Sequence, residues 1–312
     1  MKNLSYFALC GIMSAWPFLS GAMPSGNRRA AEGGIIRKIV EVKGADEELE
    51  LFLKLPACKA KGVLCLCLLS FGDKTVEERL KSPESDKRIS SLLRYAAKHD
   101  FAVLAWTVVR AWDSRRNWNE LDRGAARRFD EKFDAMAKAW DRALSNLALR
   151  YDLPEDGYLI WGLSAGGQFA MRLALRLPER FACVQAQVPS SFDEPVKKGA
   201  TVLWCLTTGE NETGYSRSIE FVKAARRLGY PIVYKAYPGV GHLSTSSAVR
   251  LGSACFEYAL KRKATLKSDF REAGYVADIV NQKIFPVEEI ANIPEEFRTP
   301  IPSALKKFWE AE

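Results

Sequence analysis

Histidine is scarce in this sequence, and its scarcity limits the chemistry that the chain can perform. The 312 residues contain two histidines, His99 and His242. A metal centre that uses several imidazole ligands is therefore not expected. A mechanism that needs an imidazole as its base must use one of these two side chains.

Other classes of protein are excluded by what the composition lacks. Glycine shows no regular period, which excludes a collagen-like chain, and seven cysteines in 312 residues are too few for a small disulfide scaffold. Hydrophobic residues make up 47% of the chain and charged residues 27%, as in a globular protein. The net charge is +8, but the basic residues are spread along the chain and no nucleic-acid-binding motif accompanies them. We therefore expect no nucleic-acid partner.

The first 22 residues have the character of an export signal. Lys2 is followed by an uncharged apolar run from Leu4 to Leu19, and then by small residues at 20–22. This order predicts a signal peptide over residues 1–22 and a secreted or periplasmic protein. A membrane anchor is the alternative, but the run is shorter than the ~20 residues that a spanning helix needs. No later segment is long enough to span a bilayer, so we expect no membrane contact after the leader is removed.

Six cysteines remain after the leader, and most of them lie in apolar runs. Cys65 and Cys67 alternate with leucines within residues 63–69, and Cys183 and Cys205 lie in similar runs. Free cysteine behaves as a small hydrophobic residue. We therefore expect buried thiols, and not disulfides, at most of these positions.

Two kinds of hydrophobic pattern divide the chain into strands and helices. Residues 35–42 and 48–55 alternate apolar and polar side chains, as an antiparallel edge pair would. Short apolar runs typical of buried strands follow at 63–69, 101–109, 158–161, 182–188, 202–206 and 232–236. Helical patterns lie between them, at 86–98, 124–150, 166–177, 215–228 and 246–262. The alternation predicts an α/β fold with a mostly parallel sheet of about eight strands and helices on both faces.

The last part of the sequence has a different character. From residue 264 to 312, four prolines break the chain into short pieces, with one expected helix near 303–310. About fifty such residues are poorly suited to an independent core. We therefore expect one α/β domain over residues 23–263 and a C-terminal tail, 264–312, packed on that domain.

A glycine-flanked serine carries the strongest functional motif. Gly162-Leu163-Ser164-Ala165-Gly166 follows an expected strand and opens an expected helix, which is the context that a G-x-S-x-G turn requires. Such a sharp turn strains the serine backbone and leaves no room for side chains two residues away on either side. The Ala165 amide lies at the helix N-terminus, where it can donate a hydrogen bond to an oxyanion.

With this motif, residues 35–263 resemble the α/β-hydrolase family. That resemblance implies a serine nucleophile, an acid and a histidine in this order along the chain. His242 lies in a glycine-rich loop between the last strand and the last long helix, where the family keeps its histidine. His99 follows a surface-type helix and is interpreted as an exposed or capping residue. Ser164 and His242 are therefore the candidate nucleophile and base.

The acid is less sharply defined by the same resemblance. After the strand at 202–206, the turn Thr207–Gly214 aligns Glu212 with the family's third catalytic residue, although aspartate is commoner there. Glu210 and Asp193 are the alternatives, and the carboxylates that are not used are expected to accept hydrogen bonds from loop amides.

Two further parts of the site are expected on loops that follow strands. The second oxyanion donor is assigned to Gly72, or to Asp73 if the alignment differs by one residue. A loop after the strand at 101–109 carries Arg110 and Trp112 at the sheet edge where sites in α/β folds form. These two residues are candidates for a substrate pocket, and a solvated loop is the equal alternative.

The hypothesis from the sequence is a secreted serine hydrolase that cleaves an ester through an acyl-enzyme on Ser164. The G-x-S-A-G-G form resembles the carboxylesterase, feruloyl-esterase and polyester-depolymerase branches, so a small-molecule or polymer-borne ester is the expected substrate. The mechanism requires no metal and no organic cofactor. A peptidase of the prolyl-oligopeptidase type, a non-catalytic binding protein and an acyltransferase are the alternatives. The oligomeric state is left open.

Overall fold

The computed structural model describes residues 34–44, 47–68, 75–108, 123–290 and 293–311. The expected leader, residues 1–22, lies outside these ranges. So do four of the predicted site residues, which are Gly72, Asp73, Arg110 and Trp112.

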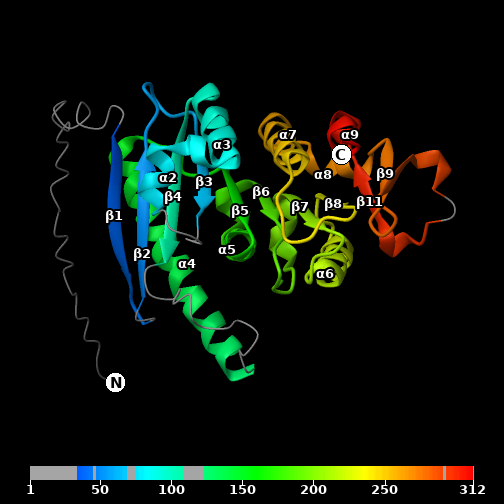
Figure 1. Ribbon diagram of the computed structural model, residues 1–312, viewed down its shortest axis with the longest axis horizontal. Helices are drawn as coiled ribbons and strands as arrows, with labels where there is room; N and C mark the ends of the chain where they lie inside the picture. Colours follow the sequence, from blue (N-terminus) through cyan, green and yellow to red (C-terminus); the bar gives the residue numbers. More distant parts are fainter. Residues whose placement is uncertain (1–33, 45–46, 69–74, 109–122, 291–292, 312) are drawn as a thin grey trace, which may run out of the picture.

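An eight-stranded sheet forms the centre of the molecule, with the order β1-β2-β4-β3-β5-β6-β7-β8 (Figure 1). The first two strands pair antiparallel, β2 also pairs antiparallel with β4, and all the other pairs are parallel. The fold class predicted from the sequence is confirmed. The strands are β1 Ile35–Val42, β2 Glu47–Lys54, β3 Gly62–Cys67, β4 Phe101–Val108, β5 Tyr158–Leu163, β6 Phe181–Gln187, β7 Leu203–Gly209 and β8 Ile232–Tyr237.

Helices cover both faces of this sheet, and each face has its own apolar core. One core joins the sheet to α4 Arg123–Tyr151, α5 Ala165–Arg176 and α6 Tyr215–Arg227. The other joins it to α2 Val76–Lys81, α3 Lys87–Lys98, α7 Ser246–Arg262, α8 Leu266–Arg271 and α9 Ser303–Trp309. The strands of the parallel part are buried on both faces because helices lie above and below them, which explains their continuous apolar sequence.

The tail contains a second sheet that the sequence did not predict. Three short antiparallel strands, β9 Tyr275–Asp278, β10 Lys283–Pro286 and β11 Arg298–Ile301, form it in the order β10-β9-β11. Proline in a strand usually argues against that strand, because proline has no N–H to donate. Pro286 and Pro300 are tolerated because β10 and β11 are the two edge strands of this small sheet.

Side chains of the tail cover the free edge of β8. Thr299 Oγ1 donates to the Ile232 carbonyl at 2.7 Å, and Trp309 Nε1 donates to the Tyr234 carbonyl at 2.7 Å. The Ala236 N–H in turn donates to Gln282 Oε1 at 2.8 Å. These alternate residues of β8 present backbone groups away from β7, and unpaired groups on a strand edge invite pairing with another chain. Figure 1 shows the tail, in orange and red, lying beyond β8.

The cysteines lie as most of their sequence contexts suggested. The six in the described residues are free, and all except the exposed Cys58 are buried. Burial raises the pKa of the Cys183 and Cys255 thiols well above the ordinary value, since an apolar environment disfavours the thiolate. In the described part of the chain, none of the helices is both long and apolar enough to cross a bilayer.

Candidate active site

Ser164 lies on a sharp turn between the end of β5 and the start of α5. Its backbone has φ 55° and ψ −122°, a conformation that residues with a side chain rarely adopt. Its N–H donates to the carbonyl of Gln187, at the end of the neighbouring strand β6, at 2.8 Å. A strained backbone of this kind persists only where the surrounding structure fixes it, and it is common at functional sites.

The glycines around Ser164 are required by the closeness of the backbone. A Cβ on Gly162 would lie 2.1 Å from the Gly166 carbonyl oxygen, and one on Gly166 would lie 2.2 Å from the Cys67 carbonyl oxygen. Both distances are well inside van der Waals contact, and the obstacle in each case is backbone that cannot rotate away. The steric reason inferred from the G-x-S-x-G motif is therefore confirmed.

His242 lies between the serine and a carboxylate. Its Nε2 is 2.8 Å from Ser164 Oγ, and its Nδ1 is 2.8 Å from Glu212 Oε2. A carboxylate accepts the Nδ1–H, which leaves Nε2 as the nitrogen that can accept the serine proton. The histidine side chain is 51% exposed, whereas that of Glu212 is 4% exposed. The arrangement is therefore a half-exposed imidazole between a serine hydroxyl and a buried carboxylate.

The loop that follows β7 fixes the position of Glu212. Thr213 Oγ1 donates to the second carboxylate oxygen, Glu212 Oε1, at 3.0 Å. The Asn211 N–H donates to the Val240 carbonyl at 2.9 Å, which ties this loop to the histidine loop. A buried carboxylate is costly unless it is paired and hydrogen-bonded, and both of its oxygens have partners here.

The two alternative acids are held elsewhere. Glu210 accepts a hydrogen bond from the Gly239 N–H at 3.2 Å, as expected for a carboxylate that is not used. Asp193 instead receives hydrogen bonds from Arg172 at 2.7 Å and from Arg176 at 2.8 Å. The expectation of loop amides as its partners was therefore wrong. Its partners are arginine side chains of α5.

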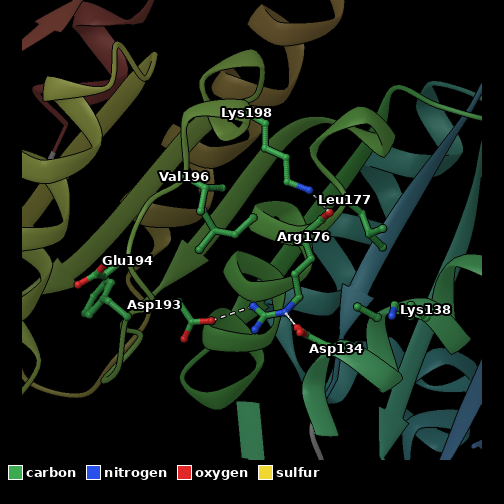
Figure 2. A pocket seen from close by; sticks show the side chains of 11 residues that line it. Asp134, Lys138, Arg176, Leu177, Asp193, Glu194, Val196 and Lys198 are labelled. Atoms are coloured by element: carbon green, nitrogen blue, oxygen red, sulfur yellow. Dashed lines mark hydrogen bonds and ion pairs between the residues drawn. The ribbon is translucent and has the colours of Figure 1, made fainter. Parts of the chain in front are cut away.

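Asp193 and Arg176 line a hollow of about 670 Å³ between α4, α5 and the loop after β6 (Figure 2). In this hollow Arg176 also pairs with Asp134, and Lys198 Nζ donates to the Arg176 carbonyl at 2.7 Å. None of Ser164, Glu212 and His242 lines this hollow. It is thus separate from the site.

The second histidine has a structural position. His99 caps the C-terminus of α3 through its backbone N–H, as the sequence suggested. Its Nε2 lies 2.6 Å from Glu257 on α7, and its ring lies 4.5 Å from that of Tyr95. The side chain is part-buried and does not lie exposed at a helix end as one interpretation had it.

Ala165 begins α5, a helix of 12 residues, and is itself buried. Its amide thus belongs to the unpaired N–H groups at the helix N-terminus, which favour negative charge. Gly72 and Asp73, the expected source of a second amide, lie outside the described residues, as do the pocket candidates Arg110 and Trp112. Among the described residues, no group of three or more histidine, cysteine or acidic side chains could hold a metal ion.

Sequence reasoning missed the residues that support the site. Gln187 and Ser244, 57 positions apart in the sequence, share one hydrogen bond. Thr213 and Asn211 make the bonds that hold the acid loop, which is the segment 210–214 that carries Glu212. A buried strand that carries two glutamines, Gln185 and Gln187, was the one available indication, because burying an amide side chain is costly without a partner.

Comparison with known proteins defines the fold and goes no further. No protein-family model and no curated protein sequence matches the chain. A solved structure of a candidate dipeptidyl aminopeptidase IV from Bacteroides ovatus matches with a TM-score of 0.52 and 16% identity, over 73% of this chain and 36% of that one. The structure of a ferulic acid esterase matches with a TM-score of 0.49 and 18% identity, over 72% of this chain and 95% of that one. A thermostable esterase matches at 0.48 and 17%, over 67% of this chain and 56% of that one.

The strand order, the antiparallel start of the sheet and the serine turn after β5 together define the architecture. The chain has the α/β-hydrolase fold. Sequence identities below 20% support a shared fold only, so the activity has to be argued from the site residues.

Proposed function

We propose that the protein is a serine hydrolase that cleaves carboxylic esters. The observation that carries this proposal is the chain of hydrogen bonds from Ser164 Oγ through His242 to Glu212, with both distances at 2.8 Å. Serine is a weak nucleophile by itself and needs an adjacent base that a third group orients. These three residues supply all of those parts in the expected order along the chain.

The proposed reaction has two halves with the same proton route. His242 Nε2 takes the Ser164 proton as Oγ attacks the ester carbonyl carbon, and Glu212 stabilises the imidazolium that forms. The imidazolium then gives its proton to the leaving alcohol oxygen as the bond from that oxygen to the acyl carbon breaks. Water attacks the acyl-enzyme by the same route, which releases the acid and restores Ser164.

Negative charge on the carbonyl oxygen requires amide donors beside the serine. The Ala165 N–H, at the N-terminus of α5, supports one half of such an oxyanion hole. Gly72, or Asp73, stays the predicted source of the second donor. Removing one oxyanion donor costs roughly 10²- to 10³-fold in kcat in enzymes of this kind.

A fluorophosphonate probe tests the mechanism directly. The wild-type protein should gain one phosphonyl group on Ser164, measured by intact mass and peptide mapping, and Ser164→Ala should not react. Ser190→Ala is a matched control on a nearby loop and should react as the wild type does. Equal labelling of Ser164→Ala, or no labelling of the wild type, would contradict the proposal.

A substrate panel tests the bond that is cleaved. Short-chain p-nitrophenyl esters should be hydrolysed with a burst of p-nitrophenol, because acyl-enzyme accumulates. Turnover of dipeptide amides with no ester turnover would favour a peptidase, and transfer of the acyl group to an added alcohol would favour an acyltransferase.

Export is a separate part of the proposal. The sequence of residues 1–22 supports a leader that is removed on the way to a secreted or periplasmic location. Expression with the full leader should place the protein outside the cytoplasm, and N-terminal sequencing should read from Met23. Recovery of the whole chain in the cytoplasm would overturn this part and leave the hydrolase proposal intact.

A further inference from the structure

Gln187 touches both halves of the candidate site. It is the last residue of β6 and is fully buried. Its backbone carbonyl accepts the Ser164 N–H at 2.8 Å, and its side-chain Oε1 accepts a hydrogen bond from Ser244 Oγ. Ser244 is two residues after His242, so one residue is bonded to the turn that holds the nucleophile and to the loop that holds the base.

The backbone at this point is strained. Val188, directly after Gln187, has φ 43° although it is β-branched and buried. For such a residue a positive φ is a genuine outlier, and outliers of this kind mark sites where the surrounding structure enforces the geometry. Its N–H donates to the Thr207 carbonyl at 2.7 Å. Ser164 and Val188 are thus two strained residues that meet at Gln187.

Before His242, the histidine loop lies close to Gly209, where a Cβ would come within 2.1 Å of the Val240 carbonyl oxygen and 2.5 Å of the Gly241 carbonyl oxygen. Gly239 has φ 68°, and a Cβ placed on Gly239 or Gly241 would meet nothing within 4 Å. The start of the loop is held by the acid loop, through the bond from the Asn211 N–H to the Val240 carbonyl. On the far side of His242, the bond from Ser244 to Gln187 provides the matching restraint before α7 begins at Ser246.

The glutamine also appears at a position where an apolar side chain would be cheaper to bury. Among the described residues, Gln187 Nε2 has no hydrogen-bond partner, and the side chain is buried. A buried amide with an unsatisfied donor costs free energy that a methionine of similar length would not. The acceptor bond to Ser244 is the one gain that the structure shows for this side chain.

We propose that Gln187 is a positioning residue, which fixes the separation of Ser164 Oγ and His242 Nε2 by holding the serine turn with its carbonyl and the histidine loop with its side chain. This inference rests on the proposed serine-hydrolase function. Without the side-chain bond, the segment after His242 loses its link to β6, while the serine turn keeps its own bond to the Gln187 carbonyl. Misplacement of reacting groups by about 1 Å can cost on the order of a hundredfold in rate.

The test compares three variants on a p-nitrophenyl ester and on the rate of fluorophosphonate labelling. Ser244→Ala, at a half-buried position that should fold normally, removes the hydroxyl donor, and Gln187→Met removes the acceptor. Each should lower kcat and the labelling rate by about ten- to a hundredfold, with KM changed by less than about threefold. Ser244→Thr keeps a hydroxyl and should recover most of the activity.

Gln185→Met is the matched control for burial. Gln185 is as buried as Gln187 and lies on the same strand two residues earlier, but its Nε2 donates to the Ala248 carbonyl within α7, at 2.9 Å. It removes an equally buried amide from the same strand without touching Ser244, and it should leave kcat near the wild-type value.

A double-mutant cycle decides whether Gln187 and Ser244 act through each other. The double variant Gln187→Met with Ser244→Ala should be no slower than the slower single variant, because one bond is lost in all three. Multiplying effects, or a normal kcat in Ser244→Ala, would overturn the inference. If the wild type itself fails to react with the probe, the proposed function has failed instead, so the two failures are distinguishable.

Discussion

The serine turn and the histidine loop are two halves of one site, and they are held in different ways. The turn is fixed by close backbone contact, with Gly162 and Gly166 each facing a carbonyl oxygen that leaves no space for a side chain. The loop is held before His242 by close contact with Gly209 and by hydrogen bonds to the acid loop, and after His242 by the hydrogen bond to β6. Close backbone contact cannot be removed without moving the turn, whereas hydrogen bonds can be removed one at a time by substitution.

The largest effect is expected where steric restraint is broken. Gly162→Ala places a methyl group 2.1 Å from the Gly166 carbonyl oxygen, and neither backbone can move without opening the turn. We expect a loss of more than about 3 kcal/mol in the free energy of unfolding and no probe labelling. Urea unfolding followed by fluorescence measures the first, and intact mass the second. A normally stable and reactive variant would mean that the turn is more adaptable than its contacts imply.

Glu212, the proposed acid, should have the next largest effect, on activity more than on stability. Glu212→Gln keeps the size of the side chain but removes the charge that orients and stabilises a protonated His242. We expect kcat to fall roughly a thousandfold, with a melting temperature within a few degrees of the wild type. Glu210→Gln is the control, since its carboxylate accepts from the Gly239 amide, and its kcat should stay near that of the wild type.

These two substitutions also separate what the sequence could reveal from what it could not. Gly162, Ser164 and Gly166 are predictable because the requirement is local: five adjacent residues carry both the strain and the space for it. His242 and Glu212 are predictable from their order along the chain and the resemblance to a known family. The bond between Gln187 and Ser244 is not, because it joins distant positions through a polar contact that neither residue type announces.

The tail also contains structure that the local sequence did not predict. Its helix near the C-terminus follows from an uninterrupted pattern, but β10 and β11 contain prolines that argue locally against strands. Tertiary context decides the matter, since each is an edge strand paired on one side only. Arg172 and Arg176 were missed as partners of Asp193 for a similar reason. They lie one turn apart on α5, and they contact Asp193 on the loop that follows β6.

A graded effect is expected where one hydrogen bond of the acid loop is removed. Thr213→Val keeps the shape of the side chain and removes the hydroxyl that donates to Glu212 Oε1. A hydrogen bond to a charged group contributes about 1.5–3 kcal/mol, part of which water at this loop can replace. We expect kcat to fall about tenfold, measured with the same ester, whereas Thr213→Ser should stay close to wild type. Equal losses in both would point to the methyl group instead.

The smallest effect concerns the backbone strain at Ser164. Ser164→Ala and Ser164→Gly should both be inactive, but glycine accepts φ 55° without the steric cost that alanine keeps. We expect the glycine variant to be more stable than the alanine variant by about 1 kcal/mol, after the greater freedom of glycine in the unfolded chain is subtracted. Equal stabilities in urea unfolding would show that the backbone at Ser164 is not strained in solution.

The contacts between the tail and the edge of β8 predict what would happen if the tail were removed. A protein shortened after residue 263 would retain Ser164, Glu212 and His242, yet the carbonyls of Ile232 and Tyr234 and the amide of Ala236 would lose the side chains that satisfy them. Such a chain would offer a ready template for strand addition, and light scattering should detect its assembly into larger particles. The tail therefore covers a strand edge that would otherwise be open to another chain, and it also contributes buried side chains such as Leu305 and Trp309 to the core on that face of the sheet.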